Sequence, residues 1–335
     1  MTIVTKIIRF TVLVAVFALY STAGSAQFTN PRPMLRAADK YFASLMSGDF
    51  SRLERTAEAA RSKDLRIEDG QPVLAALYEG TAGCACATSL TDELWQLRRS
   101  RLQAWRSQFP SSLTARVALA SFSVYYGWFA RGNNYASAVS PDGWKLFEER
   151  VEAGRIALEA LDASAKHDEG WYATMISVAL AQHWPAQRFD ALYDEATRRH
   201  PGYLPIQFNA ANYYAPQWYG SKEAYIRFVD HAVKLVGAQF GTELYARLNW
   251  SQGSNTMFED GTADWNRMRK GFEQIVRAYP DAWNVNNFAR FSCLAGDWTT
   301  MTMLAQKIGE APVPMAWYND ARIYFACRAE AAQSK

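Results

Sequence analysis

The chain has 335 residues, and 49% of them are hydrophobic, which is enough to build a large buried core and excludes an intrinsically disordered protein. Its 36 Lys and Arg residues nearly balance its 33 Asp and Glu residues, so the net charge is only +3. Because so weak a field gives no reason to bind nucleic acid or an anionic membrane surface, we expect neither partner.

Residues 1–26 have the three parts of a secretory signal peptide. Lys6 and Arg9 supply the positive charge, Thr11–Tyr20 is apolar, and Gly24–Ala26 offers small residues before a cleavage site at Gln27. The alternative is a membrane anchor, but a span needs roughly 20 apolar residues and this run is shorter. We therefore predict an exported protein, periplasmic or secreted, with no transmembrane segment after cleavage.

From residue 34 onward, apolar residues recur at helical spacing, and no segment alternates with the period of a strand. The predicted helices span residues 34–46, 50–63, 72–78, 90–109, 113–129, 141–161, 169–182, 186–199, 203–214, 222–236, 242–252, 264–279, 282–295, 299–308 and 315–331. The helix predicted at residues 90–109 is expected to begin with a capping arrangement of Ser89 and Asp92. These helices predict an all-α protein.

The connections between the predicted helices resemble one another. Pro110, Pro201 and Pro280 each follow the second helix of a pair, whereas Gly48-Asp49 and Gly296-Asp297 each separate the two helices of a pair. Stacked helical hairpins repeat their connections in this way. The prolines are 91 and 79 residues apart, so we predict an irregular, tetratricopeptide-like helical-hairpin repeat solenoid.

The helix that begins near residue 141 has the most complete start signal. Ser140 is a good N-cap, Pro141 suits the first helical position, and Asp142 lies in the first turn. Its apolar residues recur every three or four positions, and Gly154 is one of this series. Because glycine has no side chain, we expect a partner helix to approach closely at Gly154.

Four cysteines in an exported protein favour disulfide bonds. Cys293 and Cys327 are 34 residues apart, the period of one helix-turn-helix repeat, so we predict a bond between them. Cys84 and Cys86 could form a strained ring, bind a metal or remain as thiols. The alternative for all four is that they are unpaired and buried.

Two helix junctions are rich in aromatic side chains. The first contains Tyr125, Tyr126, Trp128, Phe129, Arg131 and Tyr135, and the second contains Tyr213, Tyr214, Trp218 and Tyr219. The candidate ligand-binding residues are Arg131, Tyr135, Trp128, Tyr213, Tyr214, Trp218 and Tyr219. A guanidinium among aromatic rings suits a carboxylate, a sugar or a peptide face. The alternative is architectural: the rings fill gaps between repeats, Arg131 binds helix-end carbonyls, and the second junction packs against the first.

The same junctions are similar to a known family. The runs Ala130–Val139, Gly143–Phe147 and Ala215–Ser221 resemble the bacterial domain-of-unknown-function family numbered 4034, with its GWxxF helix and PxWxGS corner. The resemblance covers roughly residues 111–238 and departs from the family pattern at Tyr219. It implies a tetratricopeptide-related helical domain in the bacterial envelope, and it implies no activity.

No catalytic residues can be assigned from the sequence. Adjacent acidic residues occur at Glu148-Glu149, Asp168-Glu169 and Glu259-Asp260, but neighbours on a helix diverge and cannot form a facing pair. Only Glu259-Asp260, in a loop, remains a candidate. The four histidines are scattered, and no phosphate loop, nucleophile motif or metal-ligand spacing is present. We expect no metal and no cofactor.

Together these patterns predict an envelope protein that binds or scaffolds a peptide or protein partner on a concave face, and they favour a binding module over an enzyme. The alternative is an envelope glycan-binding or glycan-cleaving protein that uses the aromatic junctions. We divide the chain into a signal peptide (1–26), an N-terminal helical segment (27–110), a helical domain similar to the uncharacterised family (111–238) and C-terminal helical repeats (239–335).

Overall fold

The computed structural model describes residues 32–83, 91–132 and 135–334, which belong to one compact unit spanning Pro31–Lys335. Within these ranges the regular structure is helical, and the only β interaction is an isolated bridge between Arg66 and Pro72. The predicted all-α, helical-repeat class is confirmed. The predicted signal peptide, Cys84 and Cys86 lie outside the described residues, and the predicted division at residues 110 and 238 stays a prediction.

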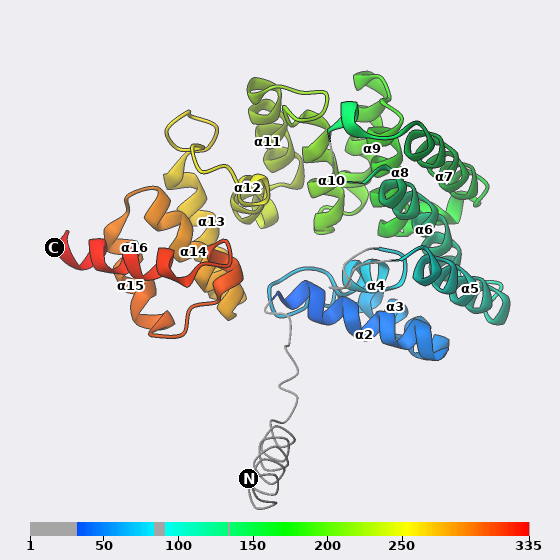
Figure 1. The fold of residues 1–335 in the computed structure, drawn as a ribbon, viewed down its shortest axis with the longest axis horizontal. Helices are drawn as coiled ribbons and strands as arrows, with labels where there is room; N and C mark the ends of the chain where they lie inside the picture. Colours follow the sequence, from blue (N-terminus) through cyan, green and yellow to red (C-terminus); the bar gives the residue numbers. More distant parts are fainter. Residues whose placement is uncertain (1–31, 84–90, 133–134, 335) are drawn as a thin grey trace, which may run out of the picture. The chain divides into compact units, whose positions relative to one another are not determined.

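The helices follow one another as pairs along the chain (Figure 1). They are α2 (Pro33–Ser47), α3 (Phe50–Lys63), α4 (Val73–Thr81), α5 (Asp92–Gln108), α6 (Leu113–Arg131), α7 (Pro141–Glu159), α8 (Glu169–Ala181), α9 (Ala186–Arg199), α10 (Leu204–Tyr214), α11 (Lys222–Val236), α12 (Ala238–Gln252), α13 (Trp265–Ala278), α14 (Ala282–Leu294), α15 (Trp298–Ile308) and α16 (Ala321–Gln333). Short 3-10 turns are η1 (Ala136–Ala138), η2 (Ala163–His167) and η3 (Pro314–Trp317). None of the described helices is long and apolar enough to cross a membrane.

The repeated Gly-Asp connections work as predicted. Gly48 and Gly296 adopt positive φ angles of 81° and 69°, which end α2 and α14 in the left-handed region. The following Asp49 and Asp297 then cap α3 and α15, accepting hydrogen bonds from backbone N–H groups at 3.1 Å and 3.0 Å. In both connections, therefore, the glycine ends one helix and the aspartate begins the next.

The predicted N-terminus of α7 is confirmed, and so is the predicted close approach of another helix at Gly154. Ser140 Oγ accepts a hydrogen bond from Gly143 N at 3.0 Å. A Cβ atom on Gly154 would lie 2.6 Å from Val124 Cγ2 and 3.0 Å from the carbonyl oxygen of Ala120. The helix that approaches is α6, which lies beside α7 (Figure 1).

Two predicted helix starts were wrong. The N-cap of α5 is Thr91, whose Oγ1 accepts from Leu94 N at 3.3 Å, and Ser89 lies outside the described residues. Helix α12 begins at Ala238, four residues before the predicted start at Thr242. Gly241 resembles a helix stop in sequence, but it lies inside α12. A Cβ there would lie 2.9 Å from the Val233 carbonyl oxygen, so this glycine lets α11 approach.

The predicted last helix, residues 315–331, is interrupted. The turn η3 is followed by Tyr318 and Asn319 with φ angles of 57° and 63°, and α16 begins only at Ala321. The buried Trp317 donates its indole N–H to Asn286 Oδ1 on α14 at 3.0 Å, which holds η3 in place. The chain must therefore turn after Trp317 before a new helix can form.

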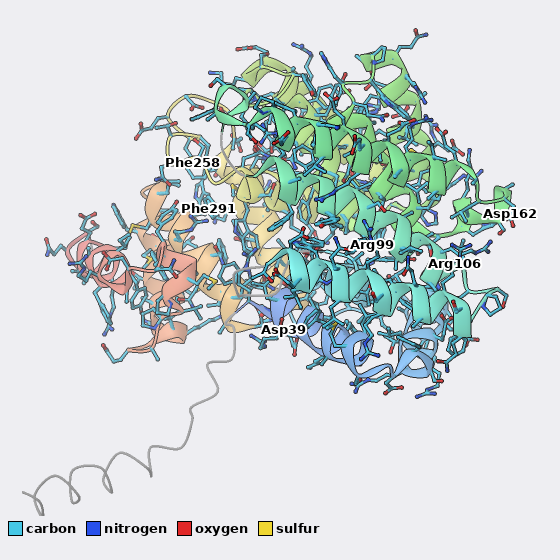
Figure 2. All side chains as sticks on the ribbon, turned by 45° about the vertical axis from the view of Figure 1, so that its right-hand side comes forward. Asp39, Arg99, Arg106, Asp162, Phe258 and Phe291 are labelled. Carbon is cyan, nitrogen blue, oxygen red and sulfur yellow. A yellow bond between two sulfur atoms is a disulfide. The ribbon has the colours of Figure 1, made fainter. Side chains whose placement is uncertain are left out.

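The C-terminal helices are cross-linked as predicted. Cys293 on α14 and Cys327 on α16 form a disulfide, with their Cα atoms 5.8 Å apart. Phe291, two residues before Cys293 on α14, is buried in the same group of helices, and side chains fill the spaces between the ribbons (Figure 2).

The first helices of successive pairs line one face. Helix α8 packs against α4, α6 and α10 as well as against its partner α9, and most of its residues are buried. A helix surrounded in this way is apolar on nearly all sides, as the sequence of α8 is. Side chains of α4, α6, α8 and α10 therefore face a common space.

A long-range contact also joins distant parts of this unit. The α3–α4 loop, residues 64–72, contains the buried Asp69, whose carbonyl oxygen accepts from Arg247 Nη2 on α12 at 2.8 Å. Asn284 Nδ2 on α14 donates to the same oxygen at 3.3 Å. Arg66 Nη1 donates to the Gly202 carbonyl oxygen at 2.9 Å. The loop thus contacts repeats far along the chain.

Candidate ligand-binding cavity

The structure contains a cavity of about 580 Å³, which we call the main cavity. Its walls come from α2, α4, α6, α8 and α10 and from the connection before α11. The apolar and aromatic lining residues include Val124, Tyr125, Trp128, Leu180, Phe208 and Trp218. A space of this size, lined by apolar and aromatic side chains together with polar ones, is typical of a ligand-binding site.

Two of the predicted site residues meet in this wall. Trp128 on α6 and Trp218 in the α10–α11 connection both line the main cavity, and their rings are 5.3 Å apart at an interplanar angle of 85°. Edge-to-face contact of this kind stabilises both rings. With Tyr125, one turn before Trp128 on α6, they form what we call the aromatic wall. The two junctions that the sequence marked are therefore neighbours in space.

Arg131 lies on the other side of the aromatic wall. Its guanidinium is 5.7 Å from the Trp128 ring and 5.4 Å from the rings of both Trp218 and Trp144. Its Nη1 also donates to the Gly132 carbonyl oxygen at 3.1 Å, as the architectural alternative expects of a helix-end residue. Arg131 is not among the residues that line the main cavity. It holds the indoles in place through cation–π contacts.

The sequence near Trp218 fixes a tight corner. Trp218 N and Gly220 N both donate to the Ala215 carbonyl oxygen, at 2.9 Å and 3.3 Å. A Cβ on Gly220 would lie 1.8 Å from the Tyr214 carbonyl oxygen, so only glycine fits there. Ser221 then caps α11 by accepting from Ala224 N at 3.1 Å. This corner points Trp218 towards α6.

The remaining predicted site residues lie elsewhere. Tyr213 is buried, and its hydroxyl donates to the Trp184 carbonyl oxygen at 2.6 Å. Tyr214 donates to Asp190, and burial raises the pKa of its hydroxyl above the ordinary value. Tyr219 stacks on His183 with ring centroids 3.7 Å apart, and Tyr135 is 87% exposed. None of these four lines the main cavity.

The polar side of the main cavity was missed by the sequence analysis. Glu79 on α4 lines it, and Tyr125 donates its hydroxyl to Glu79 Oε2 at 3.3 Å. Asn209 on α10 donates its amide to the Ala173 carbonyl oxygen and to Ser177 Oγ, both at 2.9 Å. Asn212 follows one turn later and lines the same space. With both amide hydrogens of Asn209 donated to α8, its Oδ1 can accept from a ligand, whereas the Asn212 amide can both donate and accept.

A buried polar cluster supports the floor of the main cavity. Asp168, which is fully buried, caps α8 through Trp171 N at 3.1 Å and accepts from the Tyr78 hydroxyl at 2.7 Å. Arg61 on α3 forms an ion pair with Asp168 and donates to Thr114 Oγ1 at 2.9 Å. Burial and the nearby Asp168 raise the pKa of Tyr78, so its hydroxyl remains a donor. This cluster fixes α3, α4 and α8 together.

A second, smaller cavity of about 250 Å³ lies on the other side of this cluster. Glu169 lines it, and burial raises the pKa of its carboxyl group. His200 also lines it, with Nδ1 3.8 Å from Glu169 Oε1, and burial lowers the pKa of its imidazole. The Arg61 Nε atom is 3.9 Å from Glu169 Oε2. Because burial favours the neutral imidazole, Arg61 is the cation that faces both Asp168 and Glu169, as in a structural ion-pair cluster.

The acidic loop that the sequence left as a candidate has a local role. Glu259 and Asp260 are exposed, and Asp260 accepts a hydrogen bond from Thr262 N at 2.9 Å. The hydroxyl of Thr262 also donates to this carboxylate and lowers the pKa of Asp260. Within the described ranges, no group of three or more His, Cys, Asp or Glu side chains is placed to hold a metal ion.

Comparison with models of known protein families, with curated proteins and with solved structures gives no match to this chain. The resemblance to the family numbered 4034 therefore stays a prediction.

Proposed function

We propose that this chain is a helical-repeat binding or scaffolding protein of the bacterial envelope, and that it binds a segment of a peptide or protein partner in the main cavity. The observation on which this rests is the meeting of Trp128 and Trp218 beside Glu79, Asn209 and Asn212 in one space of about 580 Å³. We further propose that the chain is related to the family numbered 4034.

The composition of the walls supports a peptide ligand. Indole and phenol rings give a large apolar contact area with little loss of side-chain entropy. Asn209 and Asn212 lie three residues apart on α10, so their amides are neighbours on one face of the helix. An extended peptide backbone presents N–H groups that the Asn209 oxygen can accept, and both N–H and carbonyl groups that the Asn212 amide can match.

The alternative is an envelope glycan, because sugar rings also lie on aromatic faces. A glycan-cleaving enzyme of the usual kind needs two carboxyl groups about 5–9.5 Å apart across the bond. Of the described residues that line the main cavity, Glu79 is the single carboxylate. The geometry therefore favours binding over cleavage.

Site-specific photo-crosslinking tests the proposed function. A benzoylphenylalanine placed at Phe208, inside the main cavity, should crosslink to a polypeptide in living cells of the source bacterium. The same group at Tyr135, which is exposed and outside the cavity, should not give this product. Crosslinks that are the same at both positions, or a product sensitive only to glycosidases, would count against a peptide ligand.

The export proposal needs its own test. Residues 1–26 fused to alkaline phosphatase, which is active only after export, should give activity in bacterial cells. Replacing Lys6 and Arg9 by Glu should reduce that activity, and the exported chain should begin at Gln27 by mass spectrometry. Activity that does not depend on these residues would contradict the proposal.

A further inference from the structure

Two hydroxyl groups in the wall of the main cavity form what we call the hydroxyl pair. Ser121 on α6 and Thr174 on α8 both line the cavity, and they are only 1% and 8% exposed. Their oxygens are 2.6 Å apart, so one hydroxyl donates to the other. Each hydroxyl has one proton, and this bond uses one of the two. No acceptor for the second proton is found among the described residues, so the pair can donate to a ligand.

Asn209 on α10 places an acceptor beside this donor. Its two amide hydrogens are donated to the Ala173 carbonyl oxygen and to Ser177 Oγ, both at 2.9 Å. Because a carbonyl oxygen can only accept, the amide nitrogen faces α8 and Oδ1 is left for a ligand. Ser177 follows Thr174 by three residues on α8, a spacing at which Cβ atoms are about 5–6 Å apart. The available donor and the available acceptor are therefore neighbours in the cavity.

The side chains that make up this part of the cavity are neutral. They are those of Ser121, Thr174, Ser177 and Asn209. The two charged residues that line the cavity, Glu79 and Arg32, are already engaged in other contacts. A charged ligand group would therefore lose its hydration here without meeting a charge of opposite sign, which is costly. A neutral group that accepts one hydrogen bond and donates another suits the hydroxyl pair and Asn209 better.

A primary amide matches the donor and the acceptor together. Its oxygen and nitrogen are bound to one carbon and are about 2.2 Å apart, so both can face the same wall. The oxygen can accept from the hydroxyl pair while the nitrogen donates to Asn209 Oδ1. A backbone peptide group cannot do this, because its N–H and C=O point in opposite directions when the bond is trans. A carboxylate has no proton for Asn209, and an ammonium group cannot accept from a hydroxyl.

We infer that the peptide segment bound in the main cavity inserts an Asn or Gln side chain between the hydroxyl pair and Asn209. This inference rests on the proposed function and specifies its ligand. The hydroxyl pair and Asn209 then determine which side chain is accepted, and the aromatic wall contacts other parts of the segment.

The experiment is selection of random peptides displayed on phage against the immobilised mature chain. Wild type should enrich peptides with Asn or Gln at one position. Replacing one hydroxyl would leave the other with its proton available, so the test uses the double variant Ser121→Ala/Thr174→Val. It should lose the preference, because the amide oxygen would then be buried without a donor.

Ser123→Ala is the matched control for the double variant. Ser123 is also on α6, but it does not line the cavity, and its hydroxyl donates to the Leu119 carbonyl oxygen at 3.4 Å. This variant should keep the preference for Asn or Gln. Far-ultraviolet circular dichroism and thermal unfolding check that both variants fold.

A synthetic copy of an enriched peptide gives the quantitative test by isothermal titration calorimetry. In one copy the amide residue is replaced by an apolar residue of similar size, Leu for Asn or Met for Gln. In another it is replaced by the matching acid, Asp or Glu. Either replacement should weaken binding to wild type about tenfold, as expected for the loss of two neutral hydrogen bonds. The double variant should bind the amide peptide and the apolar peptide about equally.

The outcomes separate this inference from the proposed function. Enriched peptides that lack Asn and Gln but lose affinity with Trp218→Ala would overturn the inference and leave the cavity as the binding site. Peptides that bind Trp218→Ala as tightly as wild type, or no enrichment at all, would overturn the proposed function and the inference with it. A preference for Asn or Gln that persists in the double variant would also overturn the inference, as would an acidic peptide that binds wild type as tightly as the amide peptide.

Discussion

Asp281 is a half-buried carboxylate at the start of α14, where it accepts a hydrogen bond from Asn284 N at 2.8 Å. Burial, and then the nearby charge of Asp69, raise the pKa of Asp281 from 3.8 to about 6. A carboxyl group whose pKa is higher in the folded chain binds protons more readily there than in the unfolded chain. It therefore lowers stability as the pH rises from about 4 through about 6.

We predict that Asp281→Asn stabilises the protein at pH 7. Asn keeps the helix cap and removes the unfavourable charge, and because the group is partly exposed we expect a gain of about 1 kcal/mol. Urea unfolding at pH 7 and pH 4 measures it, and the gain should disappear at pH 4. Asp264→Asn makes the same change at the cap of α13 and is the control. A gain that is the same at both pH values would contradict the prediction.

At this scale the sequence reveals the aromatic half of the site better than the polar half. Trp128 and Trp218 are visible because each follows a run of aromatic residues at a helix end that Gly or Pro marks. Glu79 has a weaker signal: it is the one charged residue in the apolar helix Val73–Thr81. Its meeting with Tyr125 depends on how α4 and α6 pack, which no local pattern encodes.

The distance between α6 and α7 depends on the absence of a single atom, the Cβ that Gly154 lacks. Gly154→Ala would place a Cβ 2.6 Å from Val124 Cγ2 and 3.0 Å from a backbone oxygen, so the helices must separate. We predict a loss of about 1–3 kcal/mol in the free energy of unfolding, although Ala favours helix more than Gly does. Glu149→Ala, on the exposed face of α7, should change stability little. Chemical denaturation compares the two, and equal stabilities would contradict this packing.

The disulfide joins α14 to α16 across 34 residues. Removing it restores conformational freedom to the unfolded chain, and a loop of this length corresponds to about 4 kcal/mol. We predict that Cys327→Ser lowers the free energy of unfolding by about this amount, and that reductant does the same to wild type but not to the variant. Alkylation without reductant, followed by mass spectrometry, should leave Cys293 and Cys327 unlabelled in wild type. Labelling of both would contradict the bond.

The start of a helix was predictable from sequence where a capping side chain accepts a hydrogen bond from the first turn. Ser140 and Asp297 cap helices because their oxygens accept backbone N–H groups within three residues, a local interaction that sequence shows directly. The break at Tyr318 and Asn319 was not predictable in this way. It depends on Trp317 binding Asn286, a residue 31 positions earlier.

For the whole molecule, the α3–α4 loop changes what a repeat architecture implies. In a simple solenoid each repeat contacts only its neighbours, and stability is a sum over local interfaces. Here the carbonyl oxygen of Asp69 binds Arg247 and Asn284, which are 178 and 215 residues away. The acceptor is a backbone group, which every residue has, so the sequence contains no sign of this contact.

This contact should make distant repeats unfold together. Gly70, in the same loop, has a φ of 88°, and a Cβ there would lie 2.5 Å from the Tyr279 ring and 2.7 Å from Arg247 Nη2. We predict that Gly70→Ala lowers the free energy of unfolding by about 2–4 kcal/mol, from backbone strain and steric clash together. Hydrogen exchange should then increase both in α4 and in α12, because the loop links them.

Gly261→Ala is the matched control for this prediction. Gly261 also has a positive φ, 73°, but a Cβ there would meet nothing within 4 Å. It should therefore cost only the strain of the left-handed backbone, about 1 kcal/mol, and leave exchange in α4 unchanged. If Gly70→Ala raised exchange in the loop and α4 alone, α12 would be shown to hold its structure without the loop, and the repeats would be independent.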